Sequence, residues 1–356
     1  MTAGVRAIDH RSSGEAGLAR WQGAVLLAVI AAVLGAARAT LHPEYTSDLD
    51  QLWHAGRALL DGRDPYGVVG PGRELDWPWP VFYPLPAILL ILPFCALPVA
   101  LARAAFGISL AAALGAAMAP TWRRHWPLLA SASFLMAIMR SQWSPLVLGA
   151  LWLPSLGIVL AVKPNMGPVA LAPQDRRGIL RATSGAAALA LVAFLVQPTW
   201  VRSWLAAIHD APSKEVPVLQ ATGFLLAPVL LLLRTRPGRV IGAMSLVPQT
   251  PSLYDLLPVF YIARSARQSL VLATLTHLLH WWVIATGPYG DYEAAYHALG
   301  QATVPIVLLP AVLVAWWNHR HPDLGPGDAA MAWPDRVLLG LCLVSLGLQL
   351  WLTLLT

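Results

Sequence analysis

Apolar runs long enough to cross a lipid bilayer recur along almost the whole chain, separated by short polar or charged blocks. About 20 helical residues cross a bilayer core of about 30 Å. Hydrophobic residues make up 57% of the sequence and the mean hydropathy is +0.60, more than a water-soluble domain needs for one core. We therefore predict an all-α polytopic transmembrane helical bundle of about 10 to 11 spans, with residues 1–356 forming a single multi-pass membrane domain. The expected spans are 22–40, 85–101, 104–120, 126–140, 145–162, 184–197, 222–234, 240–263, 269–286, 302–318 and 337–355.

The charged residues indicate how the spans are oriented. The net charge of +6 is an average over short basic blocks, and such blocks mark cytoplasmic loops. No basic stretch alternates with aromatic residues as in a groove that follows a nucleic-acid strand, so we expect membrane lipids as partners and no nucleic acid. Residues 1–21 lack a cleavage site and are expected to form a cytoplasmic N-terminus before an uncleaved first span. The blocks placed in the cytoplasm are QDRRGILR (174–181), RTRPGR (234–239), RSAR (264–267) and NHRH (318–321).

One basic block conflicts with this topology. TWRRHW (121–126) would lie outside if two spans precede it between residues 85 and 120. Either this region holds one span and a re-entrant piece, or a short basic outer loop is tolerated.

Cysteine and histidine give no metal or redox signature. Cys95 and Cys342 each lie in an apolar run, which predicts neither a disulfide framework nor a cysteine metal site. His277 and His280 share a helical face, but two histidines without a third ligand are a weak metal signal. We expect them to pack against the neighbouring tryptophans, and we predict no metal and no cofactor.

The largest expected outer loop, residues 41–83, holds seven of the 18 acidic residues. Within it, Ser47 followed by Asp50 fits a helix start, and Asp61 followed by glycine fits a helix end, which predicts a helix over about 48–61. It is too short to span and should lie as an amphipathic helix in the outer interface. The face expected to point into the membrane holds Leu49, Leu52, Trp53, Gly56, Leu59 and Leu60, and the face expected to point to water holds Asp50, Gln51, His54, Arg57 and Asp61.

Asp48 and Asp50 have two interpretations. As acids in the first helical turn, they would complement the helix dipole, worth about 0.3–1 kcal/mol each. Alternatively, one of them is a general base, because a carboxylate at the membrane edge can take a proton from an acceptor hydroxyl.

Five motifs in order resemble family 87 glycosyltransferases, which are polytopic membrane enzymes of the GT-C type. SDLDQLWHAGRALLDGRDPYG (47–67) is similar to the family's first outer loop, and the other four follow over residues 81–260. Ser141 stands where the family usually has glycine. The other motifs are VFYPLPAILLILPFCALP (81–98), SQWSPLVLGAL (141–151), AVKPN (161–165) and TPSLYDLLPVF (250–260).

The resemblance implies a hexosyltransferase that moves a sugar, such as mannose or a related hexose or pentose, from a polyprenyl-phosphate donor to a lipid or glycan acceptor. The expected location is the outer face of the cytoplasmic membrane, and the expected displacement is inverting. Asp48 occupies the position of the family's catalytic aspartate, and Asp50 is an additional acid beside it. Trp53 and Tyr66 would line the cavity; their alternative role is that of interfacial aromatic anchors. Gln142 belongs to the third motif.

A phosphate-linked donor requires cations, because the leaving phosphate gains negative charge in a site of low dielectric constant. Arg140 and Lys163 are the candidates. Arg140 ends an expected span, where a snorkelling arginine is the alternative interpretation. Lys163 is either buried in a re-entrant segment or an ordinary cytoplasmic flank.

The stretch MSLVPQTPSLYDLLPVFYIA (244–263) contains two apolar pieces, neither long enough to cross the membrane. Irregular backbone at membrane depth is tolerated where protein or a water-filled cavity satisfies it, so this segment is expected to frame a site; a disrupted span closed by packing is the alternative. Tyr254 and Asp255 lie in it. Asp255 must be paired or functional there, with Arg140 or Lys163 as its expected partner.

Two other functions compete with sugar transfer. A polytopic transporter or lipid flippase would also contain broken helices and charges within the membrane. A catalytically inactive partner protein is the third alternative.

Overall fold

The structure is almost entirely helical, which confirms the predicted all-α class. It is a computed structural model that describes residues 18, 21–37, 47–209, 216–249, 253–286, 292–322 and 332–355. Residues 1–17, which make up most of the predicted cytoplasmic N-terminus, and residues 41–46, at the start of the predicted outer loop, lie outside this part of the chain.

Five helical segments in the described ranges are long and apolar enough to cross a membrane. In two of them only 17% of the most apolar stretch is buried, so most of their apolar surface faces outward, which water-soluble proteins avoid. The chain is therefore a multi-pass membrane protein. The five segments are Val99–Ala130, Arg176–Val196, Ala266–Thr286, His297–Arg320 and Trp333–Trp351.

The first third of the chain contains the helix Trp21–Ala37 and the elements of the acidic loop. Two short strands, β1 (Val69–Gly70) and β2 (Leu75–Asp76), pair in parallel within that loop. The helices are α2 (Asp48–Leu60), η1 (Pro65–Gly67), α3 (Leu85–Ile91), η2 (Leu92–Ala96), α4 (Val99–Met118), η3 (Ala119–Thr121), α5 (Trp122–His125) and η4 (Trp126–Ala130).

The remaining elements alternate between long helices and short pieces. The middle of the chain holds α6 (Ala132–Met139), α7 (Ser144–Trp152), η5 (Pro154–Ile158), α8 (Val159–Val162), η6 (Pro164–Met166), α9 (Gly167–Leu171), α10 (Arg176–Val196) and α11 (Trp200–Ile208). The last part holds η7 (Pro217–Leu219), η8 (Gly223–Leu232), α12 (Arg236–Leu246), η9 (Leu253–Ile262), α13 (Ala266–Thr286), α14 (Tyr292–Thr303), η10 (Val304–Leu308), α15 (Leu309–Arg320) and α16 (Trp333–Leu355).

Proline explains the short pieces. The expected span 145–162 is not one helix, because Pro154 and Pro164 each begin a new short helix and cannot donate the hydrogen bond that would continue the previous one. The expected span 240–263 is likewise divided into α12 and η9, as its two short apolar pieces predict.

The basic block 121–126 lies inside the long helical segment Val99–Ala130 and not in a loop between two spans. Between the acidic loop and that segment lies the short apolar helix Leu85–Ala96, which favours one span plus a shorter piece in this region.

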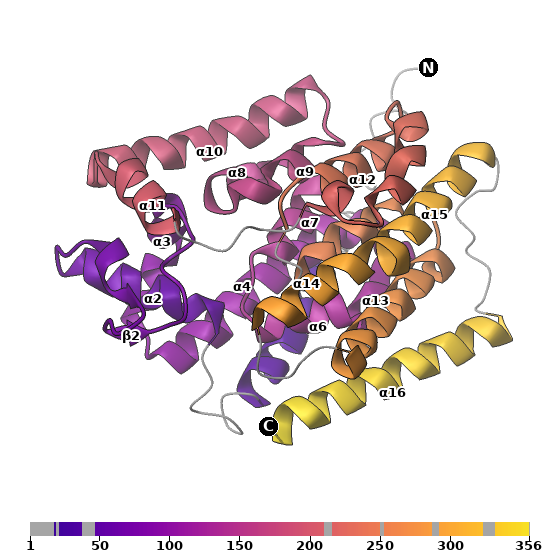
Figure 1. The fold of residues 1–356 in the computed structure, drawn as a ribbon, viewed down its shortest axis with the longest axis horizontal. Helices are drawn as coiled ribbons and strands as arrows, with labels where there is room; N and C mark the ends of the chain where they lie inside the picture. Colours follow the sequence, from indigo (N-terminus) through magenta and orange to yellow (C-terminus); the bar gives the residue numbers. More distant parts are fainter. Residues whose placement is uncertain are drawn as a thin grey trace, which may run out of the picture.

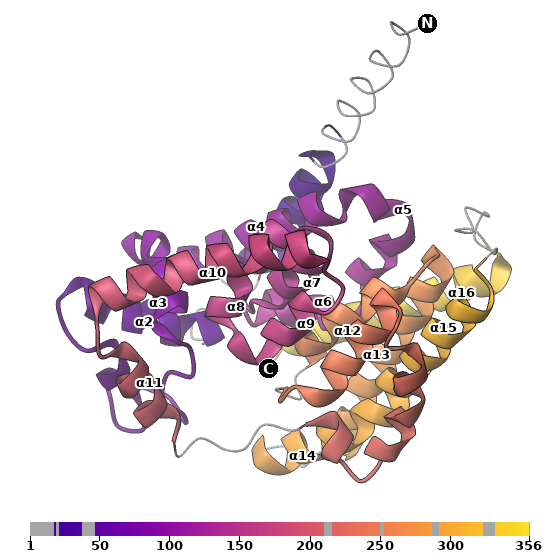
Figure 2. The same ribbon diagram turned by 90° about the horizontal axis from the view of Figure 1, so that it is seen from above.

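The arrangement in space places α7 at the centre. Helices α2, α3 and α11 gather at one end of the molecule and α12 to α15 at the other, with α4, α6 and α7 between them (Figures 1 and 2). Helix α7 packs against α4 on one side and against η9 on another. Helix α16 lies at the edge, beside α13 (Figure 1).

A close approach of two glycines brings the first apolar helix onto α4. A Cβ atom on Gly115 would lie 2.3 Å from the backbone oxygen of Gly23, so no larger residue fits without moving one helix. Small residues at such contacts are typical of helix pairs in membranes, where backbones must approach closely to gain packing energy.

Helix α2 begins and ends where the capping signals predict. Ser47 is its N-cap, Asp50 completes the capping box, and Gly62 follows with φ +71°.

The predicted division of α2 into a membrane face and a water face is wrong, however. Asp50 and Gln51, expected on the water face, are buried, and Leu60 is 58% exposed. Because α3, η2 and α4 also pack against α2, its first two turns are covered on several sides.

Candidate functional site

Asp48 is the first residue of α2, and its position is fixed by its neighbours. The Ser47 backbone N–H donates to Asp50 Oδ2 over 3.1 Å, and Arg103 on α4 donates to both Asp50 oxygens, at 2.8 and 2.6 Å. A bidentate arginine contact of this kind fixes orientation as well as distance. Asp50 therefore ties the start of α2 to α4, and its oxygens are engaged by the protein in this structure. The sequence predicts that Asp50 contacts substrate, whereas its contacts with Ser47 and Arg103 favour a positioning role.

Gln142, in the turn between α6 and α7, contacts Asp48 directly. Its side-chain amide donates to Asp48 Oδ2, and its own oxygen accepts from the Tyr83 hydroxyl at 3.3 Å. The Tyr66 hydroxyl donates to the Tyr83 backbone oxygen at 3.4 Å. Tyr66, Tyr83, Gln142 and Asp48 are therefore linked.

The backbone before Gln142 adopts an uncommon conformation. Ser141 has φ +53°, the only non-glycine residue in the described ranges with a positive φ. A side chain in this region costs about 1–2 kcal/mol, which glycine avoids. A glycine at position 141 would adopt this conformation without that cost.

Replacing Ser141 is expected to change stability according to the size of the side chain. Ser141→Gly should leave the melting temperature unchanged or raise it, since relief of strain outweighs or balances the added freedom of the unfolded chain. Ser141→Val should destabilise by roughly 1–3 kcal/mol, because a β-branched residue is strained at positive φ. Thermal unfolding in detergent measures both. Equal melting temperatures for the two variants would contradict the assigned backbone strain.

A second set of polar side chains lies in the interior around Ser144, two residues after Gln142. Asp255 in η9 is fully buried, and its Oδ1 accepts from Lys163 Nζ and, at 3.0 Å, from the Ser144 hydroxyl. Lys163 is 5% exposed, and its ammonium lies 5.0 Å from the centre of the Tyr254 ring. Of the two expected partners of Asp255, Arg140 and Lys163, Lys163 forms an ion pair with it. Lys163 is therefore a buried cation and not an exposed flank.

Helix breaks position both members of this pair. Lys163 follows α8, where its φ of −136° and ψ of 69° end the helix and Pro164 starts the next. Asp255 lies in the first turn of the 3₁₀ helix η9, which packs against α7. A buried ion pair requires satisfied hydrogen bonds to offset the loss of hydration, and Ser144 supplies one.

The two polar groups influence each other electrostatically. Burial raises the pKa of Asp48, and the cations Arg140 and Lys163 oppose this shift, whereas Asp50 and Asp255 add to it. The net direction is upward. A carboxylate with a raised pKa binds a proton more strongly, and this property suits a general base.

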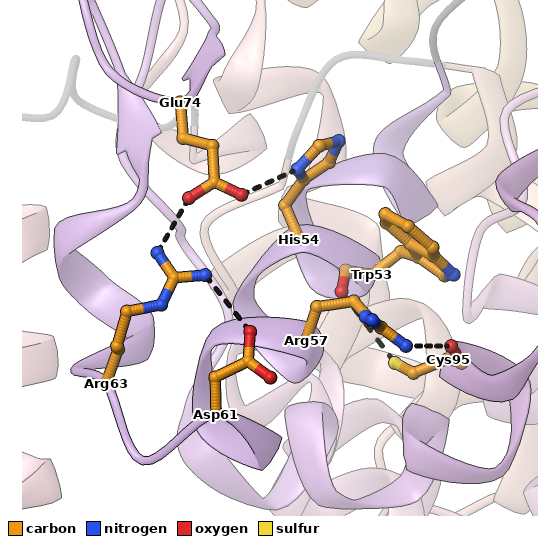
Figure 3. Close-up of polar contacts among 7 residues, drawn as sticks. All are labelled: Trp53, His54, Arg57, Asp61, Arg63, Glu74 and Cys95. Carbon is orange, nitrogen blue, oxygen red and sulfur yellow. Dashed lines mark hydrogen bonds and ion pairs between the residues drawn. The ribbon is translucent and has the colours of Figure 1, made fainter.

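Trp53 contacts residues other than Asp48. Its indole N–H donates to the Leu97 backbone oxygen at 3.1 Å, and the Arg57 guanidinium lies 5.9 Å from its ring. Figure 3 shows Trp53 beside Arg57, which reaches the Cys95 backbone oxygen at 3.4 Å. These contacts join α2 to η2 and do not include Asp48, so the expected role of Trp53 in lining the site has no contact to support it.

The rest of the acidic loop is held to α2 by surface ion pairs. Arg63 contacts Glu74 at 2.7 Å and Asp61 at 3.4 Å, and His54 lies 3.8 Å from Glu74 (Figure 3). The hydrogen bond from Arg63 lowers the pKa of Glu74. Arg63, Asp61 and Glu74 are exposed and His54 is partly buried, and none of these contacts includes Asp48.

His277 serves the packing of α13. Its Nε2 lies 2.6 Å from the Ala130 oxygen, and its Nδ1 lies 2.9 Å from the Ser345 hydroxyl and 2.8 Å from Gln349 on α16. The ring of His280 packs edge-on against Trp281, as expected. No cluster of three or more metal-ligating side chains occurs in the described ranges.

The structure thus brings most of the predicted residues together. Asp48, Gln142 and Tyr66 are connected by hydrogen bonds through Tyr83. Lys163 pairs with Asp255 and lies over the Tyr254 ring, and Arg140 is close enough to Asp48 to oppose the rise of its pKa. Sequence analysis did not select Tyr83, Ser144 or Arg103. Tyr83 and Ser144 lie within the quoted motifs. A hydroxyl group in an apolar stretch is the sequence signal that could have identified them as site residues.

Comparison of the chain with protein-family models, curated proteins and solved structures found no match.

Proposed function

We propose that this protein is a membrane glycosyltransferase that moves a sugar from a polyprenyl-phosphate donor to a hydroxyl of a lipid or glycan acceptor. One observation carries the proposal. Residues 48, 142, 163 and 255, from four separate motifs of the resemblance, meet in one polar region of an apolar helical bundle. Convergence of dispersed polar groups is characteristic of a site, because buried polar groups are costly in a membrane protein.

The proposed reaction gives each group a task. Asp48 takes the proton of the acceptor hydroxyl, and the hydroxyl oxygen forms a bond to C1 of the sugar. The bond between C1 and the phosphate oxygen breaks, and its electron pair leaves with the polyprenyl phosphate. Gln142 orients Asp48 through its hydrogen bond, and the cations Arg140 and Lys163 stabilise the leaving phosphate.

A transporter or lipid flippase remains the competing function, favoured by the buried Lys163–Asp255 pair beside broken helices. Purified protein in vesicles, supplied with radiolabelled polyprenyl-phosphate mannose and a lipid acceptor extract, separates the two. Label in a new lipid product supports transfer. Unchanged donor that crosses the bilayer, without product, supports transport and contradicts the proposal.

The outer face of the cytoplasmic membrane is the proposed location of the transfer reaction.

The rate of transfer is expected to depend on pH through Asp48. The base must be ionised, so transfer should fall as the pH falls through the pKa of Asp48, which lies above the ordinary value of 3.8. Gln142→Leu removes a hydrogen bond to the charged form and should move this acid limb to higher pH. Rates measured across pH under donor saturation test the expectation. An acid limb that is the same in both proteins would exclude Asp48 as its source.

A further inference from the structure

The side-chain amide of Gln142 bridges two partners, one at each of its polar atoms. Its nitrogen donates to Asp48 Oδ2, and its oxygen accepts from the Tyr83 hydroxyl at 3.3 Å. An ionised carboxylate can only accept hydrogen bonds, whereas a tyrosine hydroxyl can donate or accept. When Asp48 is charged, the amide nitrogen must therefore face Asp48, and the Tyr83 hydroxyl must donate to the amide oxygen.

The backbone of Gln142 is held by the end of α6. The Ser141 N–H donates to the Ile138 oxygen at 3.1 Å, and the Gln142 N–H donates to the Ala137 oxygen at 2.9 Å. With Ser141 at φ +53°, these two bonds form a Schellman motif, which closes the C-terminus of a helix. Gln142 is also only 1% exposed. A buried amide on a fixed backbone can still turn about its last side-chain bond, which exchanges the positions of oxygen and nitrogen.

Tyr83 is held in place from the outer loop and from α11. The Tyr66 hydroxyl donates to the Tyr83 backbone oxygen at 3.4 Å, and the Trp204 indole N–H donates to the Phe82 backbone oxygen at 3.0 Å. Burial raises the pKa of Tyr66, so its hydroxyl keeps the proton that it donates. Elements η1 and α11 therefore fix the chain at residues 82 and 83, from which the Tyr83 hydroxyl reaches Gln142.

We propose that Tyr83 is a positioning residue, whose hydroxyl holds the Gln142 amide in the orientation that turns its N–H toward Asp48 and thereby keeps Asp48 ionised. This inference rests on the proposed function, in which Asp48 is the base, and adds to it a residue that acts on Asp48 through Gln142. Without the hydroxyl, the amide can turn and present its oxygen to Asp48. That oxygen repels a carboxylate but accepts from a protonated acid, so Asp48 would bind its proton more strongly.

The charges around Asp48 stay the same when Tyr83 or Gln142 is replaced by an apolar residue. Elements α3, η1, η2 and β1, which pack against α2, contain no charged residue. A change in the proton affinity of Asp48 that is common to both variants therefore comes from the hydrogen bonds. The charged groups that act on Asp48 directly, or through its neighbour in the first turn of α2, are Asp50, Arg103, Arg140, Lys163 and Asp255.

Tyr83→Phe should move the acid limb of the transfer rate to higher pH by about one unit, the effect of a hydrogen bond to a charged group. Gln142→Leu moves the limb in the same direction. The double variant should show the shift of Gln142→Leu alone, because no amide remains for Tyr83 to hold. Tyr261→Phe is the control and should leave the limb unchanged. It also removes the hydroxyl of a half-buried tyrosine, whose ring packs against Trp152 at 5.9 Å between centres.

Protonation of Asp48 is measured separately from transfer with dicyclohexylcarbodiimide, which modifies carboxyl groups in their protonated form. Tandem mass spectrometry of the peptide that carries Asp48 gives the extent of modification across pH, and its midpoint should shift as the acid limb does. An unchanged midpoint in Tyr83→Phe, the same shift in Tyr261→Phe, or a double variant that shows the sum of the single shifts overturns this inference. The predicted midpoints without any transfer by the parent protein overturn the proposed function alone.

Discussion

Asp48→Asn is expected to reduce sugar transfer by roughly 10²- to 10⁴-fold while the protein remains folded. Asparagine preserves the size of the side chain and can still contact Gln142, but it cannot take a proton. Donor binding should persist, because Arg140 and Lys163 are unchanged. Transfer of radiolabel under saturating donor and acceptor gives the measurement.

The helix-dipole interpretation of Asp48 predicts a different outcome for the same variant. A first-turn acid contributes about 0.3–1 kcal/mol to stability, so only the melting temperature would fall slightly and transfer would continue. Asp61→Asn is the matched control, since this aspartate caps the other end of α2 and its side chain is 53% exposed. Equal transfer by the Asp48 and Asp61 variants would exclude Asp48 as a base.

Lys163→Met is expected to destabilise the protein by about 3–5 kcal/mol, the cost of leaving one member of a buried ion pair without its partner. Asp255 is fully buried, and its Oδ1 would keep the hydrogen bond from the Ser144 hydroxyl but lose the ammonium of Lys163. Thermal or denaturant unfolding in detergent measures the loss. Arg177→Met, which removes an exposed cation at the start of α10, should have little effect.

The double variant Lys163→Met with Asp255→Leu separates stability from function. Replacing both charges by apolar groups should restore most of the stability, because no unpaired charge remains. Transfer should stay low, since the cation that faces the leaving phosphate is gone. Recovery of transfer together with stability would show that the pair serves only the fold.

Local signals in the sequence were sufficient for α2 and for the broken segments. Capping depends on residues three apart, and proline acts on its own turn, so both are visible without knowledge of the fold. The partner of Asp255 could be narrowed to Arg140 or Lys163, because a buried carboxylate requires a cation and these two were the cations expected near the site.

The faces of α2 were not predictable for a different reason. Asp50 is buried because Arg103, 53 residues later in the chain, reaches it from α4. Amphipathic periodicity describes which residues share a face, but it does not indicate how many neighbouring helices cover the helix. For the same reason, the aromatic character of Trp53 did not reveal that its indole N–H bonds to the Leu97 backbone oxygen, directly after η2.

The most direct test of the account is to locate the donor on the chain. A photoreactive polyprenyl phosphate, activated in membranes that contain the protein, should label peptides that carry Arg140 to Ser144 or Lys163, and excess unlabelled polyprenyl-phosphate mannose should prevent the labelling. Mass spectrometry identifies the modified residues. Labelling confined to outward-facing apolar helices such as α10, and insensitive to the competitor, would contradict a sugar-lipid site at this place.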